Sequence, residues 1–239
     1  MIAASLSASP FAHLPERTWL FLRGLGICET LLSPEFATRN VGFNNATVSA
    51  ANWQVGPDDQ HCADCRILHV HGEQDEFIQA VIWPAHPERL PVFQALLWQG
   101  SHGACHASID LATPGMCTPL RDDVSEMATA LAIRHASFFP RNRSNYSTVA
   151  NAGGGGLVVN LSEGCDRSER LTQAYEDYLN AWLDFAVALP DELANDARAQ
   201  RELLRYKRQL EAAPPGKEVL YRLFGPHWAS RICGEFLYR

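Results

Sequence analysis

The chain has 239 residues and a net charge of −7, with 46% apolar and 20% charged residues. This composition is typical of a globular protein with a sizeable core, and it excludes a disordered chain. Only two of the 20 basic residues are lysines. We expect no nucleic-acid partner, because contacts to the phosphate backbone need a basic surface. No stretch approaches the ~20 apolar residues of a membrane span, and we expect a single domain over residues 1–239.

Seven cysteines occur at irregular spacing. An odd number in a chain of this length argues against a disulfide scaffold and for a reducing compartment. The N-terminal residues have no basic region before their short apolar run, so a secretory signal is not expected. We therefore predict a cytoplasmic protein.

The middle of the chain is predicted to form consecutive β-strands. Four short segments are rich in β-forming residues and bounded by Gly, Pro or Asp: residues 65–71, 76–83, 91–98 and 104–111. The gaps between them are too short for a crossover helix, so the strands are expected to pair antiparallel. The glycine run Gly153–Gly156 is interpreted as a loop, followed by a further strand at 157–161.

The C-terminal third is predicted to be helical. After a capping pair, Asp166 and Glu169, an apolar stripe recurs at three- and four-residue spacing: Leu171, Tyr175, Leu179, Trp182, Ala186 and Leu189. Further helices are expected over 191–211, over 217–224 and after Pro226. Antiparallel strands followed by helices indicate a layered α+β sandwich.

The densest group of metal-ligand side chains lies around the first of these strands: His61, Cys62, Cys65, His69 and His71. A Cys-x-x-Cys pair with nearby histidines could seat zinc, but structural zinc sites usually pair two well-spaced halves, and here the set is incomplete. In addition, His69 and His71 share one face of a strand, away from the loop cysteines. We interpret the group as a turn with partly buried thiols and expect no bound metal.

The strand at 104–111 carries a polar face. Because side chains alternate along a strand, His106, Ser108 and Asp110 share one face and apolar side chains take the other. Such a face meets either water, the commoner case, or a ligand. The neighbouring strands are apolar on both faces apart from Gln79 and Gln94, which favours a covered pocket. A histidine and an aspartate on a covered face could act as general acids, because burial moves their pKa values towards neutrality.

No nucleophile elbow, Walker loop, dinucleotide fingerprint or kinase signature is present, and nothing resembles a flavin, nicotinamide or iron–sulfur site. Any redox chemistry would therefore take its electrons from outside the chain.

Basic residues gather late in the chain: Arg198, Arg201, Arg205, Lys207 and Arg208. Most often such a run is the solvated face of a helix, but on an acidic protein it could also dock an acidic partner.

Several short motifs, in order over residues 50–239, resemble those of the ferredoxin-dependent bilin reductases. Near the C-terminus they are Phe-Gly-x-x-Trp and a helix ending in Phe-Leu (Phe224, Gly225, Trp228, Phe236 and Leu237). In the middle of the chain they are Arg-x-x-His, Trp-Pro, Leu-Pro-x-Phe and Ile-Asp-Leu-x-x-Pro (Arg66, His69, Trp83, Pro84, Leu90, Pro91, Phe93, Ile109, Asp110, Leu111 and Pro114).

The resemblance implies a three-layer α/β/α sandwich, in which a central antiparallel sheet is flanked by helices and biliverdin lies between the sheet and the C-terminal helices. It implies no bound cofactor: reduced ferredoxin delivers electrons one at a time, and the protein positions the bilin and donates protons to a substrate radical. The late basic cluster is then the expected ferredoxin-docking patch. The resemblance thus predicts an oxidoreductase of phytobilin biosynthesis that reduces biliverdin or a related linear tetrapyrrole.

Several acids that this family keeps are replaced here. The aspartate that most members place after the Leu-Pro-x-Phe turn falls at Leu96 or Leu97. The members that make phycocyanobilin carry a histidine on the preceding strand and a glutamate two residues after the Arg-x-x-His motif, and these positions are Gln79 and His71 here. The remaining donors, and hence the candidate catalytic residues, are His69, His71, His106 and Asp110. The candidate substrate-binding residues are Gln79, Leu97, Ser108 and Asn160. Two alternatives stay open, a reductase of another linear tetrapyrrole such as a chlorophyll catabolite, and a non-catalytic bilin-binding protein.

Overall fold

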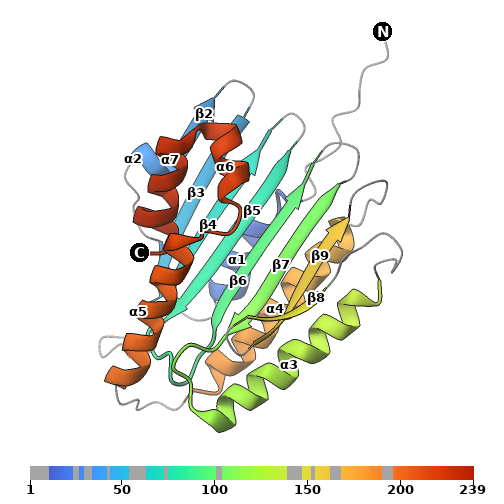
Figure 1. Cartoon of the computed structure of the whole chain (residues 1–239), viewed down its shortest axis with the longest axis vertical. Helices are drawn as coiled ribbons and strands as arrows, with labels where there is room; N and C mark the ends of the chain where they lie inside the picture. Colours follow the sequence, from blue (N-terminus) through green and yellow to red (C-terminus); the bar gives the residue numbers. More distant parts are fainter. Residues whose placement is uncertain are drawn as a thin grey trace.

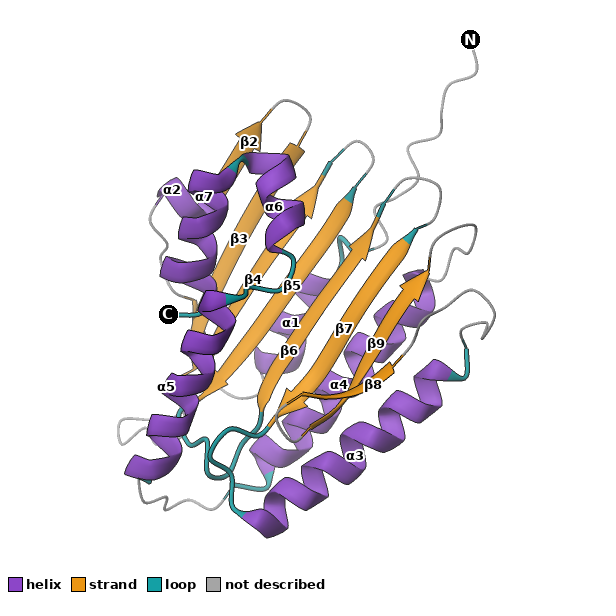
Figure 2. Cartoon of the chain, in the orientation of Figure 1, coloured by secondary structure: helices purple, strands orange, loops and turns teal. Residues whose placement is uncertain are grey.

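The structure is a computed structural model that describes residues 11–23, 27–29, 34–41, 44–53, 63–72, 75–100, 104–138, 147–151, 154–161, 168–189 and 196–239. Within these residues nine strands form one antiparallel sheet, and helices lie against both of its faces (Figure 1, Figure 2). This is the three-layer α/β/α arrangement expected from the sequence. None of the helices in the described residues is long and apolar enough to span a membrane.

The strands are β1 (Ile27–Glu29), β2 (Thr38–Val41), β3 (Asn44–Trp53), β4 (Ala63–His71), β5 (Glu76–Pro84), β6 (Val92–Gln99), β7 (Cys105–Ala112), β8 (Ser147–Asn151) and β9 (Gly154–Leu161). Their order across the sheet is β1-β3-β4-β5-β6-β7-β9-β8, and β2 also pairs with β3. The four predicted middle strands are confirmed as β4 to β7, which pair antiparallel in sequence order.

The glycine run corrects one prediction. Gly154–Gly156 belong to β9 and pair with β8, so they are part of the sheet rather than a loop. Their lack of a side chain allows a close approach: a Cβ added to Gly156 would stand 3.2 Å from the carboxyl carbon of Asp110 on β7. A glycine in a strand often marks such a contact.

The helices are α1 (Leu14–Arg23), α2 (Pro34–Ala37), α3 (Thr118–Ala136), α4 (Ser168–Val187), α5 (Ala197–Ala212), α6 (Lys217–Phe224) and α7 (Pro226–Arg231), which continues as a π-helix, Ile232–Leu237. The predicted stripe is confirmed in α4, where Tyr175, Leu179 and Trp182 are fully buried. Asp166 of the predicted capping pair lies outside the described residues. The next helix begins at Ala197, later than predicted, because the Asp196 side chain accepts hydrogen bonds from the N–H groups of its first turn.

Two hydrophobic cores sandwich the sheet. Helices α1, α3 and α4 pack on one face and helices α5 to α7 on the other (Figure 1). Strand β5 is buried along its whole length: Ile78 and Ile82 face the first core, and Phe77 and Val81 face the second. The position of a residue within its strand therefore decides which helical layer it meets.

The turn between α5 and α6 lies against the sheet. Gly216 has φ +73°, and a Cβ added there would stand 2.7 Å from the Phe77 ring and 2.9 Å from Leu96. Only glycine combines this left-handed backbone with so close an approach at no cost. The turn thus rests on β5 and β6, and the C-terminal helices lie in front of the half of the sheet that contains β2 to β5 (Figure 2).

Candidate functional site

A cavity of about 250 Å³ lies between the sheet and α5. Polar and apolar side chains of β5, β6 and β7 form its floor, and residues of α5 and the turn after it form its wall: Gln79, Val81, Gln94, Leu96, Ser108, Asp110, Tyr206, Gln209, Leu210 and Pro215. At Tyr206 and Gln209 it meets a second cavity of about 720 Å³, between α5 and the turn from β7 to α3. We call these two neighbouring cavities, which share Tyr206 and Gln209 in their lining, the groove along α5. The larger of them lies within the roughly 300–1,000 Å³ that are usual for pockets of drug-sized ligands.

The floor of the cavity carries a row of polar groups set by the sheet register. Asp110 on β7 pairs with Gln94 on β6, and Leu96 on β6 pairs with Gln79 on β5. Paired residues project on the same face of a sheet. The three polar side chains therefore cross three adjacent strands on the face that α5 covers.

Each of these side chains has a buried polar atom without a partner. These atoms are Gln79 Oε1, Gln94 Nε2 and Asp110 Oδ1. Gln79 is 3% exposed and Asp110 7% exposed. An unpartnered buried polar group costs about 1–3 kcal/mol, so three around one cavity indicate a place for a polar ligand. They offer it an acceptor, a donor and an acid.

Asp110 is the titratable group of the row. Burial raises the pKa of its carboxyl to about 7, and a hydrogen bond from the Leu111 backbone only partly opposes this effect. The carboxyl is therefore close to half protonated at neutral pH, which is the range in which a general acid works best. Tyr206 lies on the wall, and burial together with the nearby Asp110 charge raises the pKa of its hydroxyl.

The structure brings together three of the predicted site residues, Asp110, Ser108 and Gln79, in the lining of one cavity. His106 lies on the same face of β7 nearer its other end, where its Nδ1 is 2.5 Å from Asn160 Oδ1. Asn160 is exposed. This His106–Asn160 pair does not line the cavity.

Three predicted site residues lie on the opposite face of the sheet, which corrects their assignment to the same site. His69 pairs with Ile78, so it faces the α1 side, where its Nε2 lies 2.9 Å from Glu76 Oε1. His71 shares that face and is exposed. Leu97 is fully buried in the core against α4. The reason is the two-residue period of the strands, which places Leu96, and not Leu97, on the face of the sheet that lines the cavity.

The predicted metal-ligand group is dispersed. His61 and Cys62 lie outside the described residues. Cys65 is buried in the core on the α4 side, where burial raises the pKa of its thiol. In the part of the chain that the structure describes, no group of three or more His, Cys, Asp or Glu side chains could hold a metal ion.

The basic cluster of α5 divides into three parts. Arg198 and Arg205 line the larger cavity, together with Glu88, Asp196 and Glu202. Lys207 is held 4.8 Å above the Trp83 ring and donates to the Arg239 carbonyl at 3.0 Å, and burial lowers its pKa. Arg201 and Arg208 are exposed. Arg198 and Arg205 are exposed as well, so four of the five basic side chains are accessible to a protein partner.

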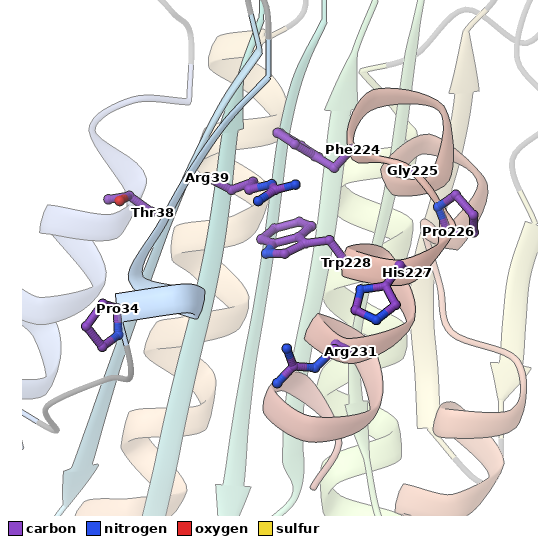
Figure 3. A pocket seen from close by; sticks show the side chains of 9 residues that line it. All are labelled: Pro34, Thr38, Arg39, Phe224, Gly225, Pro226, His227, Trp228 and Arg231. Carbon is purple, nitrogen blue, oxygen red and sulfur yellow. The ribbon is translucent and has the colours of Figure 1, made fainter.

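Another cavity, of about 450 Å³, lies between α2–β2 and α6–α7 (Figure 3). Arg39 and Arg231 both reach into the space around Trp228, together with Phe224. Arg231 is paired with Glu235 through two hydrogen bonds of 2.9 Å. None of the buried unpartnered polar atoms of the described residues lies on this cavity, so the groove under α5 is the better candidate site.

Sequence reasoning missed three residues that line the site and a fourth, Tyr238, that bonds one of its residues. Gln94 was noted as a polar interruption of an apolar strand but was not assigned to the site. Tyr206 and Leu210 are four residues apart on α5, a spacing that marks one helix face, yet nothing in the sequence indicates which sheet residues this face meets. Tyr238 bonds Gln79 across 159 positions of sequence, and no local pattern encodes such a contact.

Comparison with known proteins supports the same interpretation. No family model matches the chain. In sequence it is 35% identical over 74 residues to phycoerythrobilin:ferredoxin oxidoreductase of Gloeobacter violaceus, a match that covers 29% of this chain and 29% of that protein. In fold it is similar to the crystal structure of phytochromobilin synthase from tomato in complex with biliverdin, with a TM-score of 0.73. That match covers 95% of this chain and 82% of the other, at 16% identity.

The predicted resemblance to the ferredoxin-dependent bilin reductases is thereby confirmed: one stretch of the sequence and the whole described fold resemble proteins of this kind. The sequence match spans less than a third of the relative's length.

Proposed function

We propose that the protein binds a linear tetrapyrrole such as biliverdin in the groove between β5–β7 and α5, and reduces it with electrons from ferredoxin. The observation that carries this proposal is the row of unpartnered buried groups of Gln79, Gln94 and Asp110 on the covered sheet face. A tetrapyrrole supplies pyrrole N–H donors and lactam C=O acceptors, attached to a largely apolar conjugated chain. Apolar walls with a few convergent polar groups suit such a molecule.

The reduction of one bilin double bond consumes two electrons and two protons. Two reduced ferredoxins each supply one electron and become oxidised, so the chain itself needs no bound redox cofactor. After the first electron the pigment is a radical anion, and protonation allows it to accept the second electron. Asp110 is our candidate donor of one proton, because its pKa of about 7 lets it hold a proton at neutral pH. Ser108 and Gln79 are candidate binding groups on the same floor.

We further infer that the electron donor docks on the outer face of α5, at Arg201 and Arg208. Both side chains are exposed, and basic side chains on an otherwise acidic protein attract an acidic partner over about 8–10 Å at ordinary ionic strength. Of the predicted patch, Arg198 and Arg205 are also exposed and lie beside the larger cavity. Lys207 contributes less, because it is held against the Trp83 ring and the Arg239 carbonyl. A cytoplasmic location agrees with the free thiols of the described cysteines, including Cys233.

The test has two stages. Purified protein is first titrated with biliverdin, and binding at about one equivalent with a Kd in the micromolar range or below should shift and sharpen the absorption of the pigment. Ser108→Phe, which fills the cavity floor, should abolish the shift, whereas Thr129→Phe on the exposed side of α3 should not. Reduced ferredoxin is then added without oxygen, and bleaching of the biliverdin band should follow.

The outcomes separate the candidate functions. A spectrum equal to that of free biliverdin would refute the whole proposal. Tight binding without reduction would identify a non-catalytic bilin-binding protein. Reduction only of a different linear tetrapyrrole would leave the site intact and change the substrate.

A further inference from the structure

The Gln79 amide has two different ends in two different environments. The side chain is 3% exposed and lies in the middle of β5. Its Nε2 donates a hydrogen bond to the hydroxyl of Tyr238. Its Oε1 is buried, has no partner, and belongs to a side chain that lines the groove under α5. The amide is thus held at its donor end and free at its acceptor end.

Tyr238 is fixed by contacts away from this cavity. It is 2% exposed, and its ring packs edge-on against Trp83 at 6.3 Å between centroids. Its backbone N–H donates to the Cys233 carbonyl at 3.1 Å. The preceding residue is held as well, since Trp83 Nε1 donates to the Leu237 carbonyl at 3.0 Å. The Tyr238 hydroxyl, which accepts the hydrogen bond from Gln79, therefore belongs to a packed segment. Its position is fixed by contacts within the protein and needs no ligand.

We propose that Tyr238 is a positioning residue, which orients the Gln79 amide so that Oε1 accepts an N–H group of the bound tetrapyrrole. The inference rests on the proposed function for its ligand. Rotation of the amide by half a turn would present Nε2 instead, and the same position would then favour a carbonyl of the ligand. In the structure the Tyr238 hydroxyl accepts from Nε2, which leaves Oε1 as the end of the amide that faces the groove.

The orientation of the Gln79 amide matters for ligand recognition because of the neighbouring side chain of Gln94. Gln94 on β6 leaves Nε2 unpartnered in the same cavity and therefore offers a donor. Gln79 and Gln94 are diagonal neighbours on one sheet face, and such positions lie roughly 7–8 Å apart. At two separate points the floor then offers an acceptor, Gln79 Oε1, to an N–H of the ligand and a donor, Gln94 Nε2, to a C=O of the ligand. Without Tyr238 the Gln79 amide would lose the hydrogen bond that holds it in the observed orientation.

The first test needs no ligand. Protein labelled with ¹⁵N-glutamine should show one side-chain amide whose hydrogens exchange slowly with water, and its absence from Gln79→Leu identifies it. In Tyr238→Phe this signal should shift and exchange at least about tenfold faster, because the acceptor has gone. Tyr221→Phe is the matched control, since it removes another tyrosine hydroxyl, 2.6 Å from Ser230 on the exposed side of α6. The control should leave the Gln79 signal unchanged.

The second test measures biliverdin binding in a double-mutant cycle. Tyr238→Phe should weaken binding roughly threefold to tenfold in the wild-type background, the worth of one hydrogen bond. In the Gln79→Leu background the same substitution should change the dissociation constant by less than about twofold, because no amide is left to orient. Thermal unfolding of each variant reports any loss of structure separately.

The outcomes are distinguishable. Equal losses of affinity in both backgrounds would overturn the inference and make Tyr238 a packing residue only, while bilin binding by the wild type would keep the proposed function. A Gln79 signal unaffected by Tyr238→Phe would overturn it as well. If the wild type binds no biliverdin, the proposed function falls and so does the recognition of an N–H group, whatever the amide signal does.

Discussion

Replacement of Asp110 by Asn separates the cost of burying this carboxyl from its use as a proton donor. Asp110 is 7% exposed, and burial raises its pKa from the ordinary 3.8 to about 7. The unfolded chain therefore releases this proton near pH 3.8, and the folded chain keeps it until about pH 7. Between these values the folded state binds more protons, so the free energy of unfolding falls as the pH rises.

The magnitude follows from the same two values. At about 1.36 kcal/mol per pH unit, the difference between 3.8 and about 7 corresponds to a cost of roughly 4 kcal/mol. The cost is absent below pH 3.8, grows through the window, and is complete above about pH 7. Asparagine stays neutral throughout, so Asp110→Asn should gain stability over wild type by roughly 2 kcal/mol between about pH 5 and pH 7. Urea unfolding across this range measures the gain, and a constant difference would refute the burial argument.

The same variant tests the chemistry. Asp110→Asn should still bind biliverdin but reduce it roughly 10²–10⁴-fold more slowly, because it has no proton to donate. The wild-type rate should fall as the pH rises through about 7, since the protonated carboxyl is the donor. His71→Gln should leave the rate near wild type, because His71 is exposed on the other face of the sheet. An active Asp110→Asn variant, or a stalled His71→Gln variant, would contradict this assignment.

Three further predictions concern the turn, the docking face and the groove. Gly216→Ala should cost about 1–3 kcal/mol and lower the Tm, because alanine is strained at φ +73°, whereas Gly234→Ala, which approaches only the end of a flexible side chain, should cost less. Reversal of Arg201 and Arg208 to Glu should slow reduction, weaken its salt dependence and leave biliverdin affinity unchanged; an equal loss of affinity would mean that these arginines hold the fold or the pigment. Gln94→Leu should weaken biliverdin binding roughly threefold to tenfold in a spectral titration while leaving urea stability unchanged or higher, because it removes an unpartnered buried donor.

The docking prediction has a matched control of the same charge change. Arg23→Glu together with Arg134→Glu alters exposed arginines in the layer of α1 and α3, on the other side of the sheet. It should leave the rate of reduction near wild type. A comparable loss of rate in this control would mean that net charge, rather than a patch on α5, governs the encounter.

The sequence by itself determined the elements whose patterns are local. The strands β4 to β7 and their antiparallel order follow from β-forming runs with short gaps, and the buried stripe of α4 follows from its helical spacing. The polar face of β7, with Ser108 and Asp110, follows from alternation alone. The helix α3 was not predicted, since its buried positions, among them Ala128 and Ala132, are too small to mark an apolar stripe.

Only the tertiary structure decided which of the candidate residues meet. Alternation along a strand determines which side chains share a face of the sheet. Which helices cover that face is determined by packing between segments far apart in sequence. Asp110 and Gln79 came to the α5 side, whereas His69 and Leu97 came to the α4 side. The bond from Gln79 to Tyr238 joins residues 159 positions apart. Such contacts form only when the sheet and the C-terminal helices pack together. A pattern of neighbouring residues in the sequence does not specify that packing.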